Sequence, residues 1–169
     1  MEAAEVKALM EKLLEGARAN LSKDGDLLPV VVLNSPLGDV LFGLAGFGPT
    51  SDDRRRVLYY IGKSARAVGV KPADVGYAVL LLDTYLRELE VGEAVPRGPL
   101  LDDPKAKEAV YIEAKTPGGK TIACLRQVYE KEFRFDGPVF HFREKEWMSF
   151  SRSETILDAL FQGLRGELL

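Results

Sequence analysis

The chain has 169 residues, of which 46% are hydrophobic and 29% charged, and this balance favours one folded domain over residues 1–169 and excludes a disordered chain. Its formal charge of −3 argues against nucleic acid as a partner, because such binding depends on neutralising phosphates. The sequence has no signal-peptide pattern, no apolar run long enough to span a bilayer, and a single cysteine. We therefore expect a soluble, cytoplasmic protein without a membrane partner. Scarce asparagine and glutamine beside abundant charge are typical of thermophiles.

The first predicted element is an amphipathic helix from about Ala3 to Ser22, since apolar residues recur there at steps of three and four. Two strands follow, at Leu27–Leu33 and Val40–Phe47. The turn residues of 34–39 join them as a hairpin. Pro29 has no N–H to donate, so it should lie near the start of its strand or on a sheet edge.

A second helix begins where Thr50 or Ser51 can cap its N-terminus, and it ends at Gly69. The segment Asp74–Leu82 is an almost continuous apolar run, which predicts a strand covered on both faces. The pattern leaves open an alternative in which the chain forms a helical turn through Asp83–Leu89.

The stretch Glu90–Lys107 contains several prolines and is predicted to be an exposed loop, of a length that is often functional. Two hairpins are predicted beyond it. Glu108–Lys115 pairs with Lys120–Tyr129 in the first, and Lys131–Phe135 pairs with Val139–Arg143 in the second.

The last helix is predicted to start near Ser151, because Ser151-Arg152-Ser153-Glu154 has the form of a capping box. The whole order is α-β-β-α-β-β-β-(β)-α. It predicts an α+β fold with a mostly antiparallel sheet of five to six strands and about three helices. This order is similar to that of the profilin-like and roadblock-like interaction modules, apart from the Glu90–Lys107 loop and an extra strand. The resemblance implies a module that works by protein contact.

Cys124 and His141 are the only cysteine and histidine, so they are the first candidates for catalysis. Strand alternation places Cys124 on an apolar face, where a thiol is inert. His141 falls on the face opposite Phe140 and Phe142, together with Arg143, and a solvated or paired histidine is favoured there. Because no catalytic or metal-binding motif is present, we assign no catalytic residue, no metal ligand and no cofactor.

The most distinctive charge pattern is Arg54-Arg55-Arg56 at the start of the second predicted helix. Three arginines in one helical turn can recognise carboxylate or phosphate groups. The structural alternative is a solvated helix face with salt bridges to neighbouring acids, and the composition favours it.

These observations favour a non-catalytic protein–protein interaction or accessory module, whose partner is itself, as a homodimer, or another protein. The alternative is a small-molecule-binding domain or an enzyme of unrecognised type, with a groove near His141, Arg143 and Arg126. RNA binding through the basic helix is the weakest hypothesis, because the whole chain is acidic.

Overall fold

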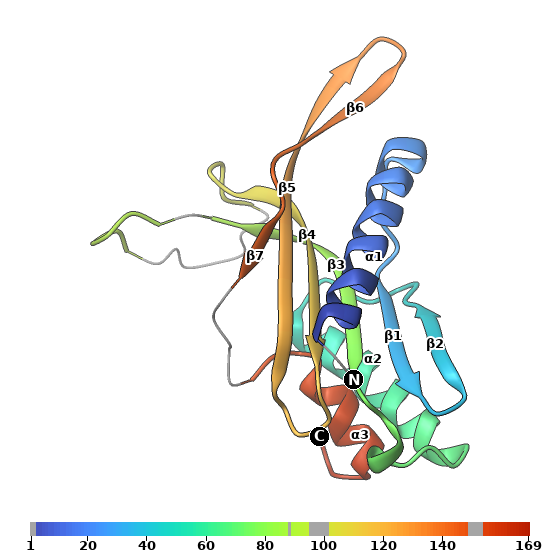
Figure 1. Cartoon of the computed structure of the whole chain (residues 1–169). Helices are drawn as coiled ribbons and strands as arrows, with labels where there is room; N and C mark the ends of the chain where they lie inside the picture. The colour runs from blue at the N-terminus through green and yellow to red at the C-terminus, as the bar shows by residue number, and fades with distance from the viewer. Residues whose placement is uncertain (1–2, 88, 95–101, 149–153) are drawn as a thin grey trace.

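The computed structural model describes residues 3–87, 89–94, 102–148 and 154–169, and it confirms the predicted α+β class (Figure 1). In chain order the elements are α1 (Ala3–Asp24), β1 (Val30–Ser35), β2 (Gly38–Gly43), α2 (Ser51–Ala67), the 3-10 turn η1 (Pro72–Asp74), β3 (Ala78–Leu86), β4 (Lys107–Lys115), β5 (Thr121–Arg134), β6 (Gly137–Phe142), β7 (Glu146–Met148) and α3 (Asp158–Arg165).

The strands form one antiparallel sheet in the order β2-β1-β3-β4-β5-β6, and β7 also pairs with β5. Strand β7 pairs with Cys124–Arg126, whereas β6 pairs with Tyr129–Arg134. Two short strands therefore share the outer edge of β5. The described residues form seven strands, one more than the upper limit that the sequence predicts.

Helices cover both faces of the sheet. Because successive side chains of a strand point in opposite directions, one strand contributes to the cores on both faces. In β3, Val79 and Leu81 are buried in the core with α1, and Ala78, Leu80 and Leu82 are buried in the core with α2 and α3. Figure 1 shows α1 on one side of the sheet and the other two helices behind it. The apolar run in this segment correctly predicts a strand buried on both faces.

Both long helices follow the sequence pattern. The buried face of α1 is a stripe at steps of three and four, made of Val6, Met10, Leu14, Ala17 and Leu21. Helix α2 begins after Thr50, whose side-chain oxygen accepts a hydrogen bond from the Asp53 N–H at 3.1 Å. This N-cap confirms the predicted start of α2.

The predicted division of residues 120–135 into two strands is wrong, because β5 runs without a break from Thr121 to Arg134. The reason lies in its neighbours. Strand β4 pairs with β5 as far as Tyr129, and β6 pairs with it from Tyr129 onward. The backbone of Glu130 and Lys131 therefore has a partner strand, although these side chains interrupt the apolar pattern.

The predicted start of the last helix is also wrong in the described residues, and Ser151, Arg152 and Ser153 lie outside them. Glu154 is not helical, and α3 begins at Asp158. The carboxylate of Asp158 accepts a hydrogen bond from the Thr155 N–H at 2.8 Å. This bond closes the turn that leads into α3, whose N-cap residue, Leu157, makes no side-chain capping bond.

Smaller differences concern strand ends. Strand β1 begins at Val30, so Pro29 lies just before it, and its carbonyl oxygen accepts a hydrogen bond from the Leu44 N–H at 2.8 Å. Strand β2 covers Gly38–Gly43 and stops short of the predicted Phe47. Strand β3 continues to Leu86, which excludes the helical-turn alternative in that part of the chain.

Candidate functional sites

The three arginines of α2 point to three different environments. The Arg54 Nε donates a hydrogen bond to the Gly48 carbonyl oxygen at 3.0 Å. Arg55 forms an ion pair with Glu154 at 3.3 Å, and Arg56 is exposed. Arg55 and Arg56 line one surface pocket with Asp52, whereas Arg54 does not line it.

The other predicted binding residues lie on the β5 edge of the sheet. His141 Nε2 is 2.7 Å from Glu132, and an Arg143 Nη is 2.8 Å from Glu130. Arg126 lies farther back along β5, where its Nε donates to Glu146. His141 and Arg143 thus have the cross-strand acidic neighbours that the structural alternative favours.

A second feature of this edge is a projecting hairpin, residues 130–142, which we call the arm. Figure 1 shows it extending beyond the helices at one end of the sheet. Past Tyr129, the only described strand that pairs with β5 is β6. Near the turn, Phe133 is 83% exposed and Phe135 is fully exposed. The arm therefore exposes two aromatic side chains at its projecting end.

The arm has an aromatic side and a charged side. Tyr129 pairs with Phe142, and Phe133 pairs with Pro138, on the side that continues the α1 face of the sheet. At the root, Phe140 and Phe142 pack against the core, with ring centroids 5.9 and 5.8 Å from Tyr129. The root is thus anchored, while the tip at Phe133 is not covered by described residues.

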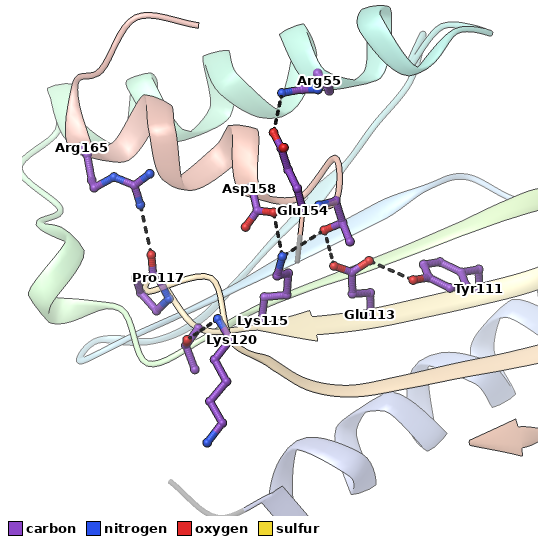
Figure 2. Close-up of polar contacts among 11 residues, drawn as sticks. Arg55, Tyr111, Glu113, Lys115, Pro117, Lys120, Glu154, Asp158 and Arg165 are labelled. Carbon is purple, nitrogen blue, oxygen red and sulfur yellow. Dashed lines mark hydrogen bonds and ion pairs between the residues drawn. The ribbon is translucent and has the colours of Figure 1, made fainter. Parts of the chain in front are cut away.

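A buried polar cluster lies on the opposite face of the sheet, where β4 meets the start of α3 (Figure 2). Glu113 of β4 is only 2% exposed. Its carboxylate accepts hydrogen bonds from the Tyr111 hydroxyl at 3.0 Å and from the Thr155 hydroxyl. Both carboxylate oxygens are therefore satisfied by neutral donors, as a buried acid requires.

Lys115 extends the cluster towards α3. It is 0% exposed, and its ammonium donates to the Asp158 carboxylate at 2.7 Å and to the Thr155 hydroxyl at 3.4 Å. The same Asp158 oxygen receives the Thr155 N–H. Figure 2 shows Lys115 and Glu113 reaching from one strand towards the first turn of α3. The cluster therefore fixes the entry of α3 onto the sheet.

Burial raises the pKa of two groups in and beside this cluster, Glu113 and Cys124. Removal from water raises the pKa of Glu113, although its hydrogen bonds from Thr155 and Tyr111 and the charge of Lys115 oppose the shift. Burial also raises the pKa of Cys124, whose thiol donates to the Tyr111 oxygen at 2.9 Å. The predicted burial of Cys124 is confirmed, but its surroundings are not purely apolar, because the Tyr111 hydroxyl contacts the thiol.

A pocket of about 350 Å³ opens beside the cluster on the same face of the sheet. Glu113 and Tyr111 line it, as do Arg54 from α2 and Arg126 from β5. Neither His141 nor Arg143 is among the described residues of its wall. The pocket therefore brings together two of the predicted binding residues that lie far apart in the sequence.

Sequence reasoning missed the polar cluster, yet one signal was present. In β4, Val110, Ile112 and Ala114 alternate with Tyr111, Glu113 and Lys115. A central strand covered on both faces is expected to be apolar throughout, so polar residues on one of its faces indicate partners from another element. The identity of those partners, Thr155 and Asp158, is a tertiary fact.

The described residues contain no group of three or more histidine, cysteine, aspartate or glutamate side chains placed to hold a metal ion. None of the described helices is long and apolar enough to cross a bilayer. No protein-family model, no curated protein and no solved structure matches the chain.

Proposed function

We propose that the protein is a non-catalytic interaction module that self-associates through the aromatic side of the arm. The observation that carries this proposal is the exposure of Phe133 and Phe135 at the tip of one projecting hairpin. Full burial of a phenylalanine side chain contributes about 1.5–3 kcal/mol, so a partner covering both gains substantial free energy. Isolated exposed apolar residues are ordinary, but paired aromatics on a protrusion are typical of interface hot spots.

The partner contacts side chains in preference to the strand edge. Pro138 lies in β6 and has no N–H to offer an added strand. The arm also carries alternating charges, which discourage edge-to-edge pairing. Docking onto the face that contains Phe133 is therefore favoured over addition of a strand to the sheet.

The charges of the arm and its flank support a second copy as the partner. Over residues 130–143 three acidic side chains balance three basic ones: Glu130, Glu132 and Asp136 against Lys131, Arg134 and Arg143. A strongly charged partner would select an arm of opposite charge. A balanced arm instead carries no net charge, so two copies that approach about a twofold axis meet no net repulsion between their arms.

Sedimentation velocity tests this proposal. We expect the wild type to sediment at about 100 μM as a dimer, twice 18.7 kDa, since even weak dimers form at that concentration. The variant Phe133→Ser/Phe135→Ser should dissociate at least about thirtyfold more readily, which corresponds to the loss of a hot spot of about 2 kcal/mol.

The control is Leu37→Ser, the same kind of change at a fully exposed apolar residue between β1 and β2. It should leave the dimer intact. A wild type that stays monomeric at this concentration contradicts self-association, and a dimer insensitive to the double substitution contradicts the role of the arm.

A further inference from the structure

We propose that the pocket beside Glu113 binds a small molecule in which an anionic head, a carboxylate or a phosphate, is joined to an apolar body. This proposal is independent of the arm, because the pocket lies on the other face of the sheet, over β3, β4 and β5.

The pocket is built from several elements. Its residues come from the first turn of α2, from three neighbouring strands, from β7 and from the segment that leads into α3. Its volume of about 350 Å³ lies within the range of small-molecule sites. Sites on strands and helix ends hold their side chains more rigidly than sites on loops.

Two arginines supply the positive charge. Arg54 lies with its guanidinium carbon 5.4 Å from the Phe47 ring centroid and donates its Nε to Gly48. In the part of the chain that the structure describes, no carboxylate lies within ion-pair distance of Arg54. Because no described carboxylate pairs with Arg54, which lines the pocket, we infer that its guanidinium can receive an anion there.

Arg126 has a partner that a ligand can replace. Its Nε donates to Glu146 at 2.8 Å, and the Glu146 side chain is 55% exposed. An ion pair this open to solvent is weak. A ligand carboxylate or phosphate held by Arg54 and Arg126 together receives two charge-assisted contacts, which outweigh that loss.

The other lining residues of the pocket favour an apolar body beside the anionic head of the ligand. Leu82 and Leu86 of β3, Met148 of β7 and Ile156 before α3 give the pocket an apolar lining. The one acidic side chain among the described lining residues, Glu113, already accepts two hydrogen bonds, and burial favours its neutral form. The charge that the pocket offers to a ligand is therefore net positive, with an apolar surface beside it.

The test uses three probes in NMR titrations of the ¹⁵N-labelled full chain: 4-phenylbutyrate, phenyl phosphate and the neutral 4-phenylbutanol. We expect at least one anionic probe to shift the amide signals of Thr84 and Thr155 saturably. The alcohol should bind at least about tenfold more weakly, because it lacks the charge. The anionic probe that binds more tightly distinguishes a carboxylate ligand from a phosphate ligand.

The variants separate this pocket from non-specific binding. Arg54→Gln/Arg126→Gln should weaken the anionic probe at least about tenfold. Arg126→Gln alone should weaken it in the same direction if the double variant fails to fold. Arg56→Gln, on the same helix but outside the pocket, is the matched control and should bind like the wild type. Absence of saturable shifts, equal binding of the alcohol, or unchanged binding by the arginine variants would each overturn the proposal.

Discussion

Gly62 of α2 and Gly163 of α3 each pack directly against the backbone of the other helix. A Cβ atom on Gly62 would lie 1.9 Å from the Leu160 carbonyl oxygen, and one on Gly163 would lie 2.0 Å from the Tyr59 carbonyl oxygen. Because both contacts are with backbone atoms, no side-chain rotation can relieve them. These two glycines therefore set the distance between the helices that cover one face of the sheet.

Replacement of Gly62 by alanine should destabilise the protein by about 2 kcal/mol. Alanine gains about 1 kcal/mol of helix propensity over glycine, but overpacking against a backbone costs about 3 kcal/mol, so the overpacking dominates. The matched control is Gly16→Ala in α1, where a Cβ would meet no atom within 4 Å. That change should stabilise the protein by up to about 1 kcal/mol. Urea unfolding measures both, and an unchanged Gly62→Ala midpoint contradicts the close packing.

The sequence predicts the parts of this fold that local patterns specify. The α1 stripe, the Thr50 cap and the doubly buried β3 all depend on spacing within one element. The length of β5 does not, because its second half is a strand only through pairing with β6. The start of α3 likewise depends on a contact between Thr155 and Glu113, which lie 42 residues apart.

For the candidate sites, too, the sequence indicates single residues but not how the fold brings them together. Arg54 and Arg126 are both binding candidates in the sequence, but nothing in the spacing of two residues on different elements indicates that they line one pocket. The exposure of Phe133 could not be predicted from the sequence either. Alternation shows on which side of the strand a side chain lies, but it does not show whether another element covers that side.

Removal of the Asp158 carboxylate should destabilise the protein by about 3 kcal/mol, because Asp158→Ala leaves the charge of the fully buried Lys115 without its partner. The double variant Lys115→Met/Asp158→Ala removes both charges and should recover part of that loss. Thermal and urea unfolding of the single and double variants measure the coupling. A double variant less stable than Asp158→Ala alone would contradict the assignment of a buried ion pair.

The contribution of Glu113 to the free energy of unfolding should fall as the pH rises. Burial raises its pKa in the folded state above the unfolded value of about 4.3, so the folded protein holds this proton more tightly. Its contribution is complete below the unfolded pKa and is lost as the pH rises through the folded pKa. Glu113→Gln cannot titrate and serves as the reference.

The measurement is the free energy of unfolding of wild type and Glu113→Gln in urea, from about pH 4 to about pH 8. The value for the wild type minus that for the variant should decrease with rising pH and level off above the folded pKa. Carboxylates with lowered pKa, such as Asp103 and Glu132, affect both proteins equally and cancel in this difference. A difference that does not change with pH, or increases, is incompatible with a raised pKa at Glu113.

The contact between two arms is tested most directly by isotope-filtered NMR on a mixture of ¹³C-labelled and unlabelled chains. Only protons of different copies can give signals in that experiment. We predict intermolecular signals from the ring protons of Phe133 and Phe135, which the single chain leaves exposed. Their absence at concentrations where the protein is dimeric, or intermolecular signals confined to residues away from the arm, would contradict the proposed mode of association.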